Sequence, residues 1–329
     1  MVKCARCERD AVVKLSYNKA DLCSRCFCNM FENRVKHANK KFKLIGLNQK
    51  IAVGISGGKD SAAMLYVLSE LVKNIHGTAL IPIAVDEGIE GYRSQSIDKA
   101  RELCQMLGLE LQVFRYKDYF DKSMDEVIQI RDEKSENQRG FEARRSCTYC
   151  GVMRKWLLNR AAREVGANSL AIGHNADDTA QTFLMNMLRS EPDRFERFEV
   201  KGGEKDGFVK RIKPMIFNLE KECAIYCELK GIPYYRGECP YSAEAFRGEA
   251  KDFLNETEAK YPGVKFNLLK SYLNLREKMD RLEELEGKET VEEEGSAKQT
   301  SNPIAKCQVC GENTSEEVCK ACQFMRELA

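Results

Sequence analysis

The hexapeptide SGGKDS at residues 56–61 carries groups that suit phosphate binding. It follows a short apolar run at 51–55 and precedes an amphipathic segment, so it is expected to join a buried strand to the start of a helix. Glycines let backbone N–H groups approach phosphate oxygens, and a helix N-terminus adds partial positive charge. A Walker A loop would place Ser or Thr directly after its lysine, whereas Asp60 follows Lys59 here. The pattern favours a nucleotide site of another geometry over a glycine turn with an incidental lysine.

A second polar cluster, GHNADD at 173–178, follows the apolar run 169–172. In open α/β sheets the carboxyl ends of the strands face the ligand crevice. Asp178 is therefore expected there, where it would help to hold Mg²⁺ on a pyrophosphate or orient an acceptor. Asp177 would do the same or cap the next helix. Asp86, which ends the apolar run 79–85, is also expected to face the nucleotide.

Fifteen cysteines dominate the composition, and eight of them form two sets of paired CxxC motifs. The first set reads C-x2-C-x15-C-x2-C and the second reads C-x2-C-x8-C-x2-C. Four thiolates in two tight pairs suit a closed tetrahedral zinc site, although free thiols in a flexible tail and a redox role are alternatives. The expected zinc ligands are Cys4, Cys7, Cys23 and Cys26 in one set and Cys307, Cys310, Cys319 and Cys322 in the other.

Three more cysteines are placed differently: Cys147 and Cys150 form a CTYC motif, and Cys239 precedes Pro240. One interpretation is an iron–sulfur cluster held by three cysteines, which leaves one iron open to an exogenous ligand. A second is a sulfur relay through a persulfide and a disulfide. A third is an inert or zinc-bound set.

The elements that must position these groups alternate along the chain. Strands are expected at 51–55, 79–85, 110–116 and 169–172, and helices at 61–75, 95–107 and 151–165. This alternation predicts an α/β fold with a parallel sheet covered on both faces. The polar segments 131–146 and 190–210 are expected to be loops. No apolar run is long enough for a membrane span and the N-terminus has no signal-peptide core, so a cytoplasmic protein without membrane association is expected.

Charge is unevenly distributed along the 329 residues, whose formal net charge is +2. Residues 280–296 hold eight acids and two bases, so the rest of the chain is basic and favours a polyanionic partner. Basic residues in 139–160, Arg154 among them, are expected to contact a phosphate backbone or to be solvated. The expected units are a zinc module at 1–30, a basic connecting helix at 31–49, a catalytic domain at 50–282, an acidic disordered linker at 283–303 and a second zinc module at 304–329, tethered by that linker.

Taken together, the order of these motifs resembles one family. A four-cysteine module, SGGKDS, CTYC, GHNADD, a lone cysteine before proline and a final four-cysteine module recur in the TtuA/NcsA-type tRNA 2-thiouridine synthetases. These enzymes are members of the PP-loop (N-type ATP pyrophosphatase) superfamily. The resemblance covers nearly the whole chain and implies a Rossmann-like PP-loop domain flanked by two zinc modules. It also implies ATP, Mg²⁺, a three-cysteine 4Fe-4S cluster and two Zn²⁺ as cofactors.

The resemblance implies that a tRNA uridine is adenylated on its C2 oxygen and that a hydrosulfide on the open iron then displaces AMP. The residues it assigns to catalysis are Cys147, Cys150, Cys239, Asp178, Lys59 and Arg154. The residues it assigns to the nucleotide are Gly54, Ile55, Ser56, Gly57, Gly58, Lys59, Asp60, Ser61, Val85, Asp86, Gly173 and Asp178. Some relatives carry lysine at the position of Arg154, and some carry histidine at the position of Cys26.

The partners implied by the resemblance are tRNA, a second copy of the chain in a homodimer, and a sulfur source. That source is a thiocarboxylated ubiquitin-like protein or free sulfide. Two other functions remain open from the sequence. One is a tRNA 2-thiocytidine synthetase, whose members share SGGKDS and CxxC cysteines but generally lack the flanking zinc modules. The other is a non-catalytic zinc-ribbon protein that binds RNA, although the intact SGGKDS motif argues against it.

Overall fold

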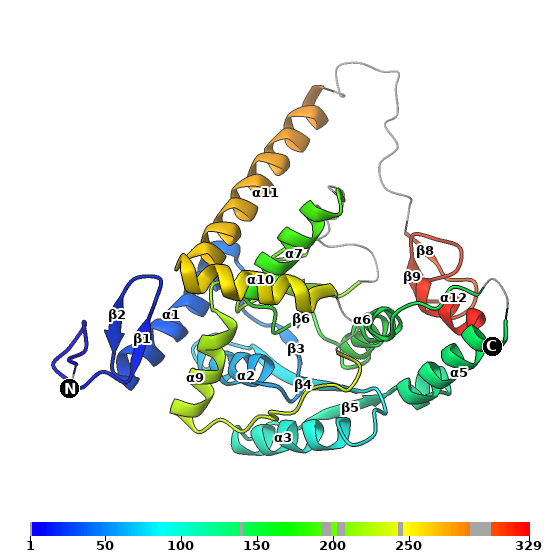
Figure 1. Cartoon of the computed structure of the whole chain (residues 1–329), viewed down its shortest axis with the longest axis horizontal. Coiled ribbons are helices and arrows are strands. Elements are labelled where there is room, and N and C mark those ends of the chain that lie inside the picture. The colour runs from blue at the N-terminus through cyan, green and yellow to red at the C-terminus, as the bar shows by residue number, and fades with distance from the viewer. Residues whose placement is uncertain (1, 139–140, 192–198, 203–207, 243–245, 290–303) are drawn as a thin grey trace.

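The computed structural model describes residues 2–138, 141–191, 199–202, 208–242, 246–289 and 304–329 (Figure 1). At its centre is a five-stranded parallel sheet in the order β5-β4-β3-β6-β7. The strands are β3 (Lys50–Gly54), β4 (Ala79–Asp86), β5 (Gln112–Arg115), β6 (Ser169–Ala171) and β7 (Lys210–Ile212). The predicted parallel α/β sheet is confirmed, and β7 is a fifth strand that was not predicted and that begins where the expected loop at 190–210 ends.

Both faces of the sheet are covered, as the unbroken apolar strands predict. In β3, Ile51 and Val53 belong to a core shared with α1, α2 and α9, whereas Ala52 packs with Ala161 and Ala162 of α6 on the other face. Strand β3 lies between β4 and β6. The strands that follow it in sequence are therefore added on both of its sides, and a crevice forms at its carboxyl end where the order reverses. The covering helices are α1 (Ser24–Phe42), α2 (Lys59–Val72), α3 (Arg93–Met106), α6 (Ser146–Glu164), α7 (Ala176–Leu188) and α9 (Glu220–Lys230).

The expected loop over 131–146 is wrong in its first half. Helix α5 (Met124–Asn137) continues through it, after the short helix α4 (Tyr116–Phe120). The buried Arg131 bonds to Ser146 Oγ at 2.7 Å, which ties α5 to the start of α6. Helix α6 also begins five residues earlier than expected, so the CTYC motif lies in its first turns instead of before it.

The two four-cysteine segments lie at opposite ends of the molecule (Figure 1). The first carries the hairpin β1 (Val13–Leu15) and β2 (Ala20–Leu22), and α1 begins directly after Cys23, whose side chain accepts from the Cys26 amide. The basic segment after this module is therefore helical. The second carries β8 (Ala305–Lys306), β9 (Asn313–Thr314) and α12 (Lys320–Glu327).

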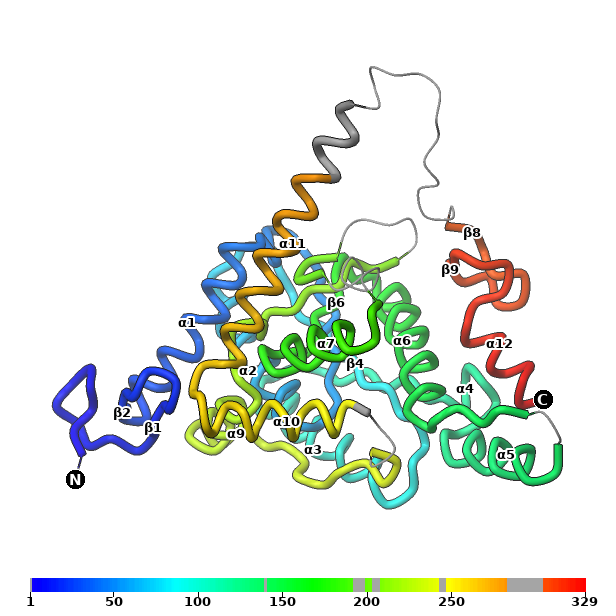
Figure 2. The backbone as a smooth tube through the Cα atoms, turned by 45° about the horizontal axis from the view of Figure 1, so that its top comes forward, coloured from blue at the N-terminus to red at the C-terminus, as the bar shows by residue number. Residues whose placement is uncertain are grey.

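The C-terminal segment is docked on the body and is not merely tethered, contrary to expectation. Phe324 and Leu328 share a buried cluster with Met153 and Leu157 of α6. Glu312 pairs with both Arg160 and Arg163 of the same helix. Helix α11 (Val264–Glu289), which follows α10 (Phe246–Lys260), runs into the expected linker as far as residue 289, and residues 290–303 lie outside the described part of the chain (Figure 2).

The N-terminal segment is joined to the body by a charged network. Arg34 of α1 pairs with Glu222 of α9 and donates to the hydroxyl of Tyr17 at 2.7 Å, and that hydroxyl donates to Glu222 at 2.7 Å. Glu222 also accepts from the Leu219 amide at the start of α9. The first module is thereby fixed to the N-terminus of α9. Among the described residues, no helix combines the length and apolarity needed to cross a membrane.

Candidate active site

The glycine-rich segment forms the turn that the sequence predicts between β3 and α2. Gly57 has a φ of +84°, and a Cβ there would lie 2.0 Å from the carbonyl oxygen of Ser96 in α3. Only glycine fits this position without displacing the backbone. Ser56 and Ser61 brace the turn, with their hydroxyl oxygens 3.0 Å apart. These contacts fix the shape of the turn at the carboxyl end of β3.

Lys59 lies in a small charged network at the start of α2. Its ammonium group pairs with Asp60 at 3.1 Å and with Glu220 of α9 at 2.9 Å. Burial opposes its charge, but Asp60 and Glu220 outweigh that effect and raise the pKa of Lys59. Lys251 of α10 pairs with Glu220 as well, at 2.9 Å. Lys59 is therefore a fully charged cation, placed by α9 beside the glycine turn.

Asp178 lies across from this network at the start of α7. Burial raises its pKa, against the effect of Arg247, whose guanidinium lies 2.9 Å from the carboxylate. Asn175 caps α7 and also donates to Asp60 at 3.1 Å, which joins the two motifs. Asp177 does neither of the things expected of it: it is buried, pairs with Lys265 of α11 and accepts from the Glu220 amide at 2.7 Å. Its role is to join α7, α9 and α11.

A cavity of about 370 Å³ opens at this edge of the sheet. The expected residues that line it are Gly54, Ile55, Ser56, Asp60, Ser61, Val85, Gly173, Asp178, Arg154 and Cys239. Asp86 is an exception, because its carboxylate accepts from the Gly88 amide at 3.0 Å and lies 3.9 Å from Arg115. The neighbouring Glu87 lines the cavity instead. The predicted residues Gly57, Gly58 and Lys59 are not among those that line the cavity.

The three isolated cysteines converge beside this cavity from two distant segments. Cys147 and Cys150 lie in the first turns of α6. Cys147 Sγ is 3.5 Å from the carbonyl oxygen of Tyr241, two residues beyond Cys239. Burial raises the pKa of Cys239, and Cys150 and Cys147 add to the rise, which places all three thiols within electrostatic reach. Sequence spacing alone could not have joined residues about 90 positions apart.

The spacing of the three sulfurs distinguishes between possible metals. In the described part of the chain, only the two four-cysteine sets bring three or more candidate ligand atoms within 4.8 Å of one another. Zinc–sulfur bonds of about 2.3 Å require sulfurs within roughly 4.6 Å of each other. The wider trio therefore does not fit a single zinc ion as it stands. A cluster of several metal ions spans a larger volume, so the wider spacing is compatible with one.

Arg154 connects the cysteines to the nucleotide turn. Its guanidinium donates to Cys150 Sγ at 2.8 Å and pairs with Glu87 at 3.0 Å. Glu87 also pairs with the buried Arg93, which donates to the carbonyl oxygens of Ser56 and Val85 at 2.7 Å. We did not predict Glu87 or Arg93 from the sequence. Glu87 directly follows the strand that pointed to Asp86, whereas no motif marks Arg93.

The two four-cysteine sets have the geometry of single-ion sites. In the first, Cys7 Sγ lies 3.6 Å from Cys23 Sγ and 3.7 Å from Cys26 Sγ. In the second, Cys310 Sγ lies 3.7 Å from Cys319 Sγ. These separations match four thiolates around one tetrahedral ion. Both sets can hold a metal ion.

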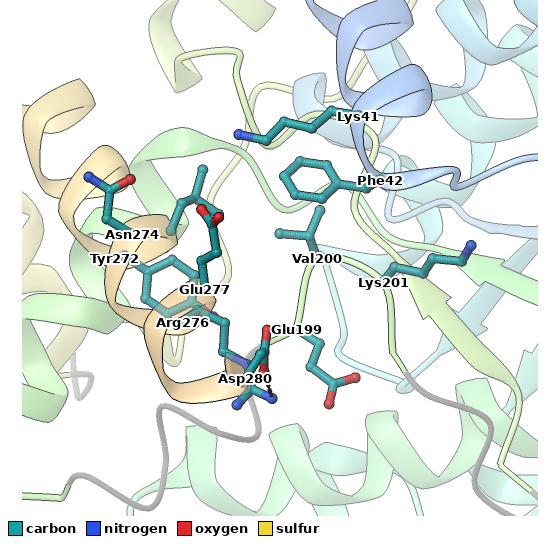
Figure 3. Close-up of a pocket in the computed structure, with 11 residues that line it drawn as sticks. Lys41, Phe42, Glu199, Val200, Lys201, Tyr272, Asn274, Arg276, Glu277 and Asp280 are labelled. Carbon is teal, nitrogen blue, oxygen red and sulfur yellow. Dashed lines mark ion pairs between the residues drawn. The ribbon is translucent and has the colours of Figure 1, made fainter. Parts of the chain in front are cut away.

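A second cavity, of about 460 Å³, lies between α1, α11 and residues 199–201 (Figure 3). Its lining includes three basic residues, Lys41, Lys201 and Arg276, and three acidic residues, Glu199, Glu277 and Asp280; Arg276 pairs with Asp280 at 2.7 Å. Since the charges balance and none of the predicted site residues lines it, this cavity does not compete with the first as the reaction site.

Comparison with known proteins decides the family. The family described as a PP-loop domain matches residues 29–248. The chain is 36% identical to a probable sulfurtransferase of Methanocaldococcus jannaschii, over 98% of this chain and 87% of that protein. It is 33% identical to the tRNA 2-thiolation protein NcsA of Haloferax volcanii, over 99% of both. The chain belongs to the PP-loop family of tRNA 2-thiolation proteins.

Two further relatives of this tRNA 2-thiolation family extend the likeness. The cytoplasmic tRNA 2-thiolation protein 1 of Saccharomyces cerevisiae is 34% identical over 99% of this chain and 86% of that protein. Among solved structures, the U34-tRNA thiolase NcsA from Methanococcus maripaludis with its [4Fe-4S] cluster has a TM-score of 0.78 and 31% identity. That match covers 100% of this chain and 97% of the other. The resemblance inferred from the motifs is confirmed, and the chain spans the relatives' length almost fully.

Proposed function

We propose that this protein replaces the C2 oxygen of uridine 34 in tRNA with sulfur, with ATP as the activating substrate. The observation that carries the proposal is a shared cavity: Cys239 and Arg154 line it together with Ser56, Asp60 and Asp178. A nucleotide on the glycine turn and sulfur held at the cysteines would both reach one base. The choice of uridine 34 rests on the family and on the M. maripaludis thiolase.

In the first half-reaction, the uridine C2 oxygen attacks the α-phosphate of ATP. A C2–O–P bond forms, the bond between the α and β phosphates breaks, and pyrophosphate leaves. Lys59 offsets phosphate charge, and Mg²⁺ held near the Asp60 and Asp178 carboxylates would add to this. We propose Gly54, Ile55, Val85 and Gly173 as the surroundings of the nucleotide, with residues 56–61 around its phosphates.

In the second half-reaction, a hydrosulfide attacks C2, a C2–S bond forms, and the C2–O bond breaks as AMP leaves with the original oxygen. We propose that Cys147, Cys150 and Cys239 would hold a 4Fe-4S cluster; three protein ligands would leave one iron available to bind sulfur. Arg154 would stabilise the Cys150 thiolate and fix its position, since it is bonded to both Cys150 and Glu87. The cysteines' place beside the cavity supplies proximity to the activated base.

The remaining parts of the proposal concern partners. The two four-cysteine sets would each hold Zn²⁺. Together with the basic faces of the chain, they would recognise the shape of the tRNA and contact its phosphates. The sulfur would come from a thiocarboxylated ubiquitin-like protein or from free sulfide. The protein would act in the cytoplasm as a homodimer, for which the name of the yeast relatives supports the compartment.

Nucleoside analysis of tRNA tests the proposal. A strain that lacks the gene should lose 2-thiouridine from tRNA, and the gene should restore it. Loss of 2-thiocytidine instead would support the related cytidine enzyme, and no change in either nucleoside would support an RNA-binding protein without this activity. Mapping of the thiolated position then tests uridine 34 separately from the reaction.

A further inference from the structure

Glu87 is a buried carboxylate that is held by two arginines at once. Its side chain is 6% exposed, and each of its two oxygens has its own partner. Arg93 Nε lies 2.7 Å from Oε2, and Arg154 Nε lies 3.0 Å from Oε1. Breaking a buried ion pair on one side is costly, so the carboxylate cannot turn toward one arginine without a loss at the other. The positions of the two arginines therefore depend on each other.

Arg93 connects this carboxylate to the glycine turn. Its Nη1 donates to the carbonyl oxygen of Ser56 at 2.7 Å, and Arg93 itself is 4% exposed. A peptide unit is planar and trans, so the hold on this carbonyl oxygen turns the N–H of Gly57, in the same unit, the opposite way. Backbone N–H groups between a glycine-rich turn and a helix are the groups that bind phosphate. Arg93 therefore fixes the orientation of one proposed phosphate donor.

Arg154 connects the same carboxylate to the cysteines. Its Nη2 donates to Cys150 Sγ at 2.8 Å, and its side chain is 48% exposed. Cys150 is buried, and its carbonyl oxygen accepts from the hydroxyl of Tyr116 at 3.0 Å. Four consecutive contacts of 2.7 to 3.0 Å thus join the Ser56 carbonyl oxygen to the Cys150 sulfur through the two arginines and Glu87.

We propose that Glu87 and Arg93 are positioning residues that couple Cys150 to the glycine turn, so that a change at the Cys150 sulfur changes the affinity for ATP. This inference rests on the proposed function, which places ATP at the turn. When the sulfur is in place, Arg154 is held from both sides and Glu87 stays shared between the two arginines. Coupling between two sites is reciprocal, so ATP binding acts on the cysteine site by the same factor. The protein then binds ATP tightly only when the site that would deliver sulfur is intact.

A double-mutant cycle on ATP affinity tests the inference. It uses full-length protein reconstituted with zinc alone, so that all variants are compared in the same metal state. Cys150→Ser should weaken ATP binding, measured by calorimetry, by about 5-fold or more. Made together with Glu87→Gln, it should add less than about 2-fold to the effect of Glu87→Gln alone, because the chain of contacts is already broken.

Two further variants complete the cycle. Arg154→Gln breaks the same chain at a half-exposed side chain, so it should give the same result as Glu87→Gln and tests the inference even if that variant does not fold. Asp98→Asn removes an exposed carboxylate from α3 and is the matched control. In that background the full effect of Cys150→Ser should remain.

Two results would overturn the inference alone. An ATP affinity of Cys150→Ser within about 2-fold of the unaltered protein would show that the two sites are not coupled. An undiminished effect of Cys150→Ser in the Glu87→Gln and Arg154→Gln backgrounds would show that Glu87 has only a structural role. Both results leave ATP binding, and with it the proposed function, intact. Failure of the unaltered protein to bind ATP would overturn the inference and the proposed function together.

Discussion

The hydroxyl of Tyr149 lies 3.0 Å from the carboxylate of Glu327, so one of the two residues between the cysteines of the CTYC motif is bound to the C-terminal segment. The Tyr149 ring also packs edge-on against Phe324, with centroids 4.9 Å apart. Arg144 lies over the same Phe324 ring and pairs with Glu327 at 3.5 Å. The second four-cysteine module therefore braces the start of α6, where two of the proposed cluster ligands lie.

Tyr149→Phe should lower both stability and cluster loading while keeping the ring contact with Phe324. The lost hydrogen bond is worth about 1 kcal/mol in the free energy of unfolding. Denaturant unfolding and iron content per chain, measured on protein purified without oxygen, check both effects. Tyr261→Phe is the matched control, since that side chain is 68% exposed. Unchanged iron content in the Tyr149 variant would contradict a bracing role.

Cys239→Ser should abolish thiolation and remove iron and visible absorbance from the anaerobic protein. The reason is that two remaining cysteines hold a cluster incompletely. The zinc content should be unchanged, because both four-cysteine sets are intact. Cys104→Ala, which alters a buried thiol in α3 away from the cavity, is the control. Full iron content and activity in Cys239→Ser would end the cluster hypothesis.

Lys59→Gln should weaken ATP binding about 10- to 150-fold, the effect of about 1.5–3 kcal/mol for a lost charge-assisted hydrogen bond. Its removal also leaves Asp60 and Glu220 without a common cation beside the phosphates. Calorimetric titration with ATP measures the change. Lys73→Gln, which removes an exposed lysine just beyond the end of α2, should bind ATP as the unaltered protein does.

Gly57→Ala and Gly58→Ala are neighbouring substitutions with different expected effects on stability. A Cβ at Gly57 meets the Ser96 carbonyl at 2.0 Å and a φ of +84°, whereas a Cβ at Gly58 has its nearest neighbour at 3.5 Å. The first variant should lose at least about 1 kcal/mol of stability from the left-handed backbone alone, and the clash adds to this. Thermal unfolding compares them, and equal melting temperatures would refute the close approach.

Glu126 provides a prediction for pH. Its bonds to Lys117 and to the Ser123 amide lower the pKa of Glu126 to about 2. A carboxyl group whose folded-state pKa is depressed stabilises the fold above its unfolded value of about 4.3 and loses that contribution as pH falls toward 2. Glu126→Gln should therefore be less stable than the unaltered protein at pH 7, and the difference should vanish as pH approaches 2. Urea unfolding across this range measures it.

Local signals in the sequence predicted the centre of the fold. The run at 51–55 and the glycines after it determine β3 and its turn through contacts among near neighbours, so the position of SGGKDS was predictable. The continuation of α5 was not, because its polar residues are satisfied by partners far away. Lys134, for example, donates to the carbonyl oxygens of Glu327 and Ala329, nearly 200 positions along the chain.

The same distinction applies to the site. The CxxC spacing predicted that Cys147 and Cys150 lie close together. The position of Cys239 near them depends on the path of residues 232–242 along the sheet. Arg93 and Glu220 support the turn from helices whose sequences carry no motif. The side chains of Asp86 and Glu87 alternate in direction at the end of β4. We predicted that Asp86 faces the nucleotide, whereas Glu87 lines the cavity.

The contacts of Tyr17 and Arg34 with Glu222 connect the N-terminal module to a different part of the site from the one that the C-terminal module contacts. The N-terminal module is joined to α9, which carries the acid that holds Lys59, while the C-terminal module supports the helix with the paired cysteines. Under the proposed function, loss of the first module would weaken activation of the base, and loss of the second would weaken transfer of sulfur. If each four-cysteine set holds its proposed metal ion, metal shortage would impair two separate half-reactions, one through each terminus.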